Sequence, residues 1–177
     1  MTKLQPFTQN SYSSSLRVSS SVSSRSQENS LLVKFEIRGE IRKIIWPDFP
    51  LAGRHHELWN QTCFELFGAQ NVSSDSPYFE VNISPTGAWN VYDFSSYRQG
   101  MQESLKSSVG GIFFDLNEDR ALVEFELKLS STLPALLGLT CVIQTEDGET
   151  QYWALQHSNT KADFHDKKTW VPSSALR

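Results

Sequence analysis

Residues 78–94 read YFEVNISPTGAWNVYDF, and this stretch decides the fold. Its first run alternates apolar Phe79, Val81 and Ile83 with polar or amphipathic neighbours, which is the period-two pattern of a half-buried strand. Residues 84–87, SPTG, then supply proline and glycine where a tight turn needs them, and a second alternating run returns. The stretch therefore predicts an antiparallel hairpin.

The same alternation recurs on both sides of this hairpin and is bounded each time by turn residues. Further strands are predicted over residues 31–38, 61–68, 121–129, 139–147 and 151–157. The dipeptide Asp147-Gly148 is a strong turn signal between the last two runs. Short strands at regular spacing favour an all-β fold, an antiparallel β-sandwich of the jelly-roll or immunoglobulin-like kind.

The chain is predicted to form one domain over residues 1–177. Residues 1–14 are expected to be a flexible segment, and the serine-rich region that follows is expected to contain a first strand near residues 15–22. One or two short helical turns are expected, near residues 101–105 and 132–138.

Composition narrows the class of partner. The chain has a net charge of −4 and a pI of about 5.6, which argues against a nucleic-acid partner because phosphate binding favours a basic surface. No apolar run approaches the roughly 20 residues of a membrane span. The N-terminal segment lacks the apolar core of a secretory signal, so a cytoplasmic protein is expected. Cys63 and Cys141 are then expected to be free, buried thiols.

One face of the predicted sheet combines amides, aromatic rings and single charges, a mixture that differs from an ordinary solvated face. Small-molecule sites pair apolar surface with a few hydrogen-bonding groups in this way. Arg98 and His165 are expected to flank this face from loops. Its predicted strand residues are Glu65, Glu80, Asn82, Tyr92, Trp153 and His157.

Three segments carry a resemblance to a known family. They are residues 58–67, LWNQTCFELF; residues 78–92 with YRQGM at 97–101; and WALQH at 153–157 with Asp163-Phe164-His165. Together they resemble the bacterial DOMON-like domain proteins, relatives of family-nine carbohydrate-binding modules and of the cytochrome domain of cellobiose dehydrogenase. The resemblance covers roughly residues 15–170. It implies a β-sandwich whose concave face holds a sugar or a haem.

A sugar is the favoured ligand. Its C–H face would stack on Trp153 or Tyr92, while Asn82, Glu80 and Arg98 would bond its hydroxyl groups. For each of these residues a purely structural role, in the core or between strand ends, is the alternative.

A b-type haem is the second ligand. Met101 and His157 are the available axial pair, although Met101 also suits a core position.

Three other functions are less favoured than small-ligand binding: a metal site, a glycosidase and a protein-interaction module. The cluster of His157, Asp163 and His165 lacks a tight metal-ligand spacing, so no metal site is predicted. A facing pair of Glu65 and Glu80 would suit a glycosidase, but a binding role is favoured over catalysis. The aromatic loop at residues 46–59 leaves a protein partner open. The sequence therefore predicts a non-catalytic domain that binds a small ligand.

Overall fold

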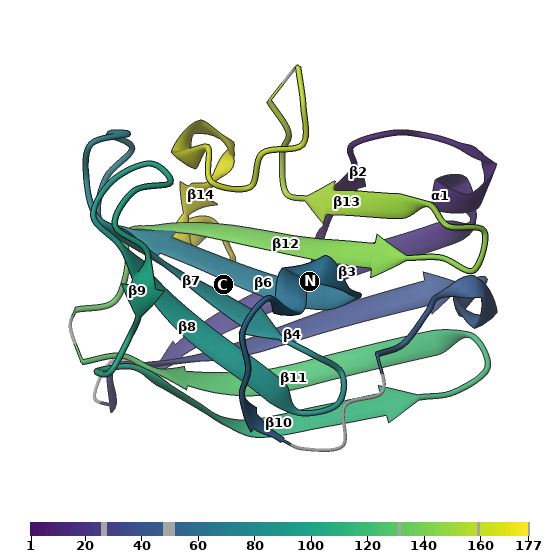
Figure 1. The fold of residues 1–177 in the computed structure, drawn as a ribbon, viewed down its shortest axis with the longest axis horizontal. Helices are drawn as coiled ribbons and strands as arrows, with labels where there is room; N and C mark the ends of the chain where they lie inside the picture. Colours follow the sequence, from purple (N-terminus) through teal and green to yellow (C-terminus); the bar gives the residue numbers. More distant parts are fainter. Residues whose placement is uncertain (26–27, 48–51, 131, 159, 177) are drawn as a thin grey trace.

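The computed structural model describes residues 1–25, 28–47, 52–130, 132–158 and 160–176. Within these residues the strands form two sheets packed face to face, so the predicted β-sandwich is confirmed (Figure 1). Ladder pairings are antiparallel apart from the short parallel contact of β5 with β8.

The first sheet has the order β1-β3-β4-β11-β10. Its central strands are long and pair without interruption, and β10 carries a bulge between Gly110 and Phe113. The strand bounds are Thr2–Lys3 for β1, Leu16–Arg25 for β3, Ser30–Gly39 for β4, Arg120–Lys128 for β11 and Ser108–Leu116 for β10.

The second sheet has the order β2-β13-β12-β6-β7-β8-β5, with β14 added to β12 and β9 added to β8. The central strands β12, β6, β7 and β8 carry the candidate site. The strand bounds are Gln5–Pro6 for β2, Thr150–Ala154 for β13, Leu136–Gln144 for β12, Cys63–Ala69 for β6, Tyr78–Ile83 for β7, Ala88–Phe94 for β8, Gly53–Arg54 for β5, Val171–Pro172 for β14 and Gln102–Glu103 for β9.

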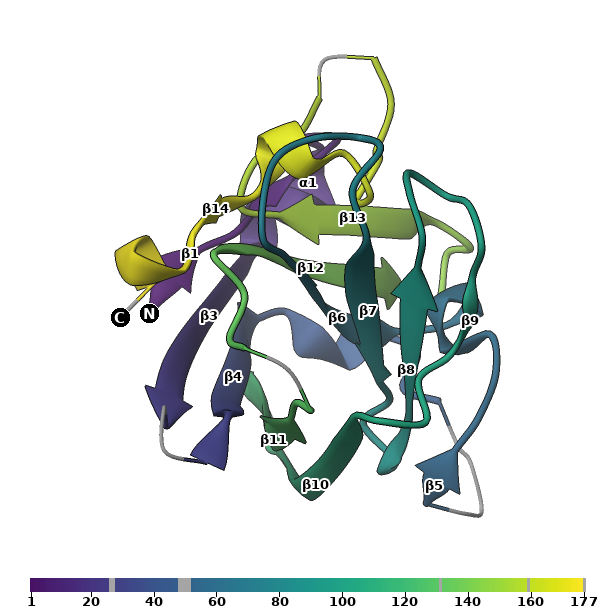
Figure 2. The ribbon, with the colours of Figure 1, turned by 90° about the vertical axis from the view of Figure 1, so that its left-hand side faces the viewer.

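The main core fills the space between the two sheets. In Figure 2, β3 and β4 lie on one side of this space and β6 and β7 on the other. Apolar side chains from alternate positions meet there, for example Phe35 of β4 with Phe64 of β6, whose rings lie 5.3 Å apart. This burial is the main favourable contribution to folding.

The outer face of the second sheet is also covered, by short helices and loops. Each residue of β6 is buried, although only every second side chain points into the main core. The helix η3 contacts β6, β7 and β8 from outside (Figure 1). The helical segments are α1 at Ser11–Ser15, η2 at Ile41–Lys43, η3 at Leu58–Asn60, η4 at Lys167–Thr169 and η5 at Ser173–Leu176.

The structure differs from the sequence-based expectation at residues 1–14. Strand β1 pairs with β3, β2 pairs with β13, and Leu4 between them is fully buried with its N–H bonded to the Val18 carbonyl. The segment is therefore held by backbone pairing at the edges of both sheets. The helical turns also lie elsewhere than expected, because residues 102–103 form β9 and β12 begins at Leu136.

In the part of the chain that the structure describes, no helix is both long and apolar enough to cross a membrane.

Candidate ligand-binding site

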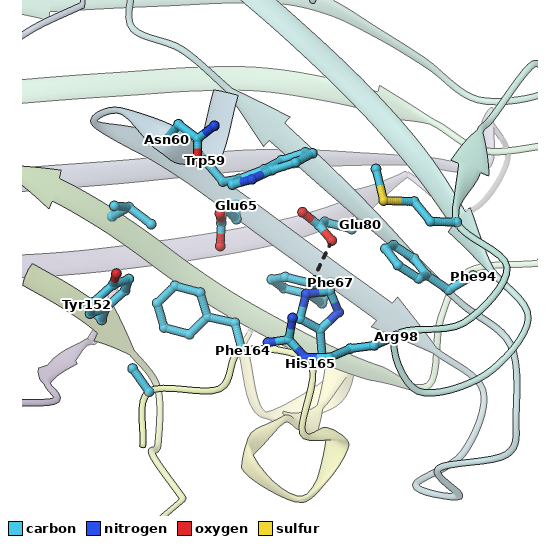
Figure 3. Close-up of a pocket in the computed structure, with 13 residues that line it drawn as sticks. Trp59, Asn60, Glu65, Phe67, Glu80, Phe94, Arg98, Tyr152, Phe164 and His165 are labelled. Carbon is cyan, nitrogen blue, oxygen red and sulfur yellow. Dashed lines mark ion pairs between the residues drawn. The ribbon is translucent and has the colours of Figure 1, made fainter. Parts of the chain in front are cut away.

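A pocket of about 410 Å³ opens on the outer face of the second sheet. This volume falls within the roughly 300–1,000 Å³ typical of small-molecule sites. Strands supply its floor, and loops supply its walls (Figure 3). The lining residues are Trp59, Asn60, Glu65, Phe67, Glu80, Phe94, Arg98, Met101, Val142, Tyr152, Ala162, Phe164 and His165.

Strand register explains why acids line the floor. In β6, Glu65 lies between Phe64 and Leu66, which both point into the core, so its own side chain points outward. Glu65 pairs with Asn82 of β7, and Glu80 of β7 pairs with Phe67 of β6. The two carboxylates therefore come from adjacent strands on one face.

Each carboxyl group has one side-chain hydrogen bond to the residues that the structure describes. The Thr140 hydroxyl donates to Glu65 Oε2 at 2.7 Å, and the Asn82 amide donates to Glu80 Oε1 at 2.7 Å. Burial and the neighbouring Glu80 raise the pKa of Glu65 to about 8. Burial likewise raises the pKa of Glu80 to about 7. The pair therefore holds at least one proton at neutral pH, because two close, desolvated carboxyl groups resist ionising together.

His165 is oriented by Tyr78. The Tyr78 hydroxyl accepts the Arg98 backbone N–H at 3.2 Å and lies 2.6 Å from His165 Nδ1. His165 Nε2 lies 3.7 Å from Glu80 Oε2, the contact drawn in Figure 3.

That contact is not an ion pair at neutral pH. Burial, together with the nearby Arg98 charge, lowers the pKa of His165 to about 4. The imidazole is therefore neutral beside Glu80.

Arg98 lies at the rim of the pocket and forms an ion pair with Asp163. Its guanidinium donates to Asp163 Oδ1 at 3.0 Å, and the Tyr97 hydroxyl bonds the other carboxylate oxygen. Burial alone would raise the pKa of Asp163, but the hydrogen bonds from Tyr97 and Arg98 outweigh it and keep the pKa below its usual range. Asp163 is therefore ionised and balances the Arg98 charge.

Aromatic rings supply the apolar surface. Trp59 is the middle residue of η3 and meets the Tyr92 ring edge-on at 5.6 Å. Phe164 lies on the other side of the two carboxylates in Figure 3. Its carbonyl oxygen accepts the Trp170 indole N–H at 2.8 Å, which fixes that segment. Flat apolar walls thus surround a polar floor.

Four predicted site residues line this pocket together: Glu65, Glu80, Arg98 and His165. Asn82 and Tyr92 lie on the predicted face but are buried beneath it. Asn82 bonds Glu80, and the Tyr92 hydroxyl contacts Asn90 at 3.1 Å. These two residues position the site rather than line it.

Trp153 is not part of the pocket. It pairs with Cys141 in the β12–β13 ladder, so it shares the core-facing side and is 1% exposed. Its neighbour Tyr152 points to the pocket instead. The prediction had assigned the two faces of β13 the wrong way round.

The residues present do not fit a haem site built on the predicted pair. Met101 lines the pocket, but His157 does not. His157 Nε2 lies 2.8 Å from the Gln5 carbonyl oxygen at the edge of the sheet. Two buried carboxyl groups would also face the macrocycle.

Sequence analysis did not single out eight of the lining residues, which come from strands, from η3 and from the segment before η4. Trp59 appears there only within the aromatic loop and the motif at residues 58–67, and Phe164 only within a motif. The missed lining residues are Trp59, Asn60, Phe67, Phe94, Val142, Tyr152, Ala162 and Phe164.

No protein-family model and no curated protein sequence matches this chain. The fold of this chain is, however, similar to that of several solved structures. A Bacteroides uniformis protein, provisionally described as carbohydrate-binding, is 8% identical with a TM-score of 0.59, over 94% of this chain and 83% of that one.

Two structures of a family-nine carbohydrate-binding module from Caldicellulosiruptor kristjanssonii are also similar. The complex with glucose is 10% identical with a TM-score of 0.54, over 94% of this chain and 78% of that one. The complex with cellotriose is 11% identical with a TM-score of 0.54, over 95% and 77% of the two chains. At these identities the comparison concerns architecture, and it shows that the chain has the fold of a family-nine carbohydrate-binding module.

Proposed function

We propose that the chain is a non-catalytic carbohydrate-binding domain that holds a sugar in the pocket on the second sheet. The observation that carries the proposal is the combination of aromatic walls with inward polar groups in one pocket. Sugars present apolar C–H faces and a rim of hydroxyl groups, and this pocket offers a partner for each. The fold shared with modules solved with glucose and cellotriose supports the same ligand class.

Each group has a definite role in this proposal. Trp59 and Phe164 supply surfaces for the apolar face of the ring. The side chains of Glu65, Glu80 and His165 meet the hydroxyl groups from the floor. The link to DOMON-like proteins rests on the sequence motifs and remains part of the proposal.

Isothermal titration against a panel of mono- and disaccharides tests the proposal. Trp59→Ala and Phe164→Ala are each expected to weaken binding at least about tenfold, or 1.4 kcal/mol, because each removes a stacking surface. Phe113→Ala is the matched control, since Phe113 is an exposed aromatic residue on β10 of the other sheet. Absence of binding across the panel, or equal affinities for all three variants, would contradict the proposal.

A further inference from the structure

The charges around the pocket do not balance. Two residues with basic side chains line the pocket. Arg98 is paired with Asp163, and His165 is neutral near pH 7. Glu65 has no ion pair among the described residues, and Glu80 meets only the neutral imidazole. The Arg98 charge acts on both carboxyl groups from the rim, but Asp163 balances it. Among the described residues, neither carboxyl group therefore has an ion pair with a charged cation at neutral pH.

Both carboxyl groups are nearly inaccessible from bulk water. Glu65 is 3% exposed and Glu80 is 5% exposed. Each uses one oxygen for an internal hydrogen bond, Oε2 of Glu65 and Oε1 of Glu80. Glu65 Oε1 accepts no hydrogen bond from any described residue, although its side chain borders the pocket. This oxygen is therefore available for a hydrogen bond or an ion pair with a polar group of the ligand.

A metal ion does not suit this arrangement. No group of three or more His, Cys, Asp or Glu side chains is placed for a metal within the described ranges. Ca²⁺ and Mg²⁺ also need more oxygen ligands than two carboxylates provide. The surrounding rings of Trp59, Phe67 and Phe164 instead suit an organic cation, because aromatic faces attract ammonium groups.

We infer that the preferred ligand is an amino sugar, whose protonated amine lies against Glu65 and Glu80 while its ring contacts the aromatic walls. The inference rests on the proposed function and narrows its ligand class. The ammonium group provides three donors and the missing positive charge. A neutral sugar brings no positive charge, so it would form no ion pair with Glu65 or Glu80.

Binding of an amino sugar beside Glu65 and Glu80 should release a proton, which can be measured. When the ammonium binds, a protonated carboxyl group ionises and its proton passes to the buffer, so an ion pair forms in the pocket. The groups that face Glu80 are Asn82, Tyr78, Tyr92, Arg98, His165, Glu65 and the Cys63 thiol. Those that face Glu65 are Thr140, Glu80, Arg98 and the buried thiols of Cys63 and Cys141. None of these other groups is expected to titrate between pH 6 and 7.

The experiment compares three amino sugars with the hexoses of the same configuration: glucosamine, galactosamine and mannosamine against glucose, galactose and mannose. Calorimetry at pH 6.5 is run in two buffers of different ionisation enthalpy. At least one amino sugar is expected to bind about tenfold or more tighter than its hexose. It should release between about half a proton and one proton per site, while its N-acetyl form, which lacks the charge, should lose this advantage.

Glu65→Gln and Glu80→Gln are each expected to reduce the preference to about twofold or less. Glu124→Gln, on β11 of the other sheet, is the control and should keep the preference. The proton release is measured on the unaltered chain, so it tests the inference even if a variant misfolds. Hexoses that bind as tightly as their amino forms, without proton release, would overturn the inference and leave the proposed function standing. No binding of any of these sugars would overturn both.

Discussion

At Tyr78 a single hydroxyl group serves two neighbours that belong to different loops. It accepts the backbone N–H of Arg98, whose φ of 54° lies in the left-handed region, and it contacts Nδ1 of His165. The Tyr78 ring is itself fixed by stacking on Phe94 at 4.6 Å and by the Lys167 ammonium 5.0 Å from its centre. The orientation of two pocket residues thus depends on one buried atom.

Tyr78→Phe removes that atom and keeps the ring. We expect the free energy of unfolding to fall by about 1–2 kcal/mol, because the Arg98 N–H and His165 Nδ1 lose a buried partner. Sugar binding should weaken as well, since both residues line the pocket. Tyr12→Phe is the control: it removes a comparable bond, to the Glu40 carbonyl, away from the pocket lining. Urea unfolding and calorimetry measure the two effects, and a Tyr78→Phe chain with unchanged binding would contradict this role.

At the scale of the strand, side-chain alternation predicted most of the sandwich but only two of the pocket residues, Glu65 and Glu80. It placed Glu65 and Glu80 correctly because apolar residues flank each of them in β6 and β7. It failed at β13, where Trp153 and Tyr152 are both aromatic and amphipathic, so their sequence does not show which one faces the core. Only the pairing of Trp153 with Cys141 decides that.

Alternation also carries no information about what covers a strand. Asn82 and Tyr92 were expected to touch the ligand, but other polar side chains and η3 bury them. The walls at Trp59 and Phe164 come from segments without a period-two pattern. Long-range packing of loops on the sheet determines them, and a single sequence does not reveal it.

Strand β12 shows how an element supports a loop. Gly138 lies beneath Trp170, and a methyl group added at Gly138 would be 2.7 Å from the indole. Trp170 also packs on Phe67, with ring centres 5.5 Å apart, and donates its N–H to the Phe164 carbonyl. The glycine therefore permits the close contact between β12 and the segment that carries Phe164.

Gly138→Ala should displace the indole and destabilise the fold by about 1–3 kcal/mol, as overpacking does elsewhere. Sugar affinity should fall with it, because the Phe164 wall shifts. Gly110→Ala in β10 is the matched control, since an added methyl group there meets no atom within 4 Å. Thermal unfolding of both variants measures the cost, and equal melting temperatures would show that Trp170 adjusts freely.

For the whole molecule, the acid pair links the site to global stability. The folded-state pKa of each glutamate is raised above its unfolded value, to about 8 for Glu65 and about 7 for Glu80. Their contribution is therefore fully present below about pH 4.5 and is lost as pH rises through 7 to 8. His165 acts in the opposite sense: its pKa is lowered to about 4, so its contribution is present above about pH 6.5 and is lost as pH falls through 4.

Between pH 5 and 8 the loss of stability from ionising Glu65 and Glu80 is larger than the gain from His165. The free energy of unfolding should therefore fall as pH rises across that range. The variant that carries both Glu65→Gln and Glu80→Gln removes the ionisable pair. Its free energy of unfolding relative to the unaltered chain should therefore increase from pH 5 to pH 8 by on the order of 6 kcal/mol. Glu118→Gln is the control, because its side chain is 88% exposed. Its free energy of unfolding should change with pH in the same way as that of the unaltered chain. Urea unfolding at pH 5, 6.5 and 8 measures all three. Parallel profiles for the double variant would mean that the carboxyl groups ionise freely in the folded protein, and the pocket would then be wetter than its burial indicates.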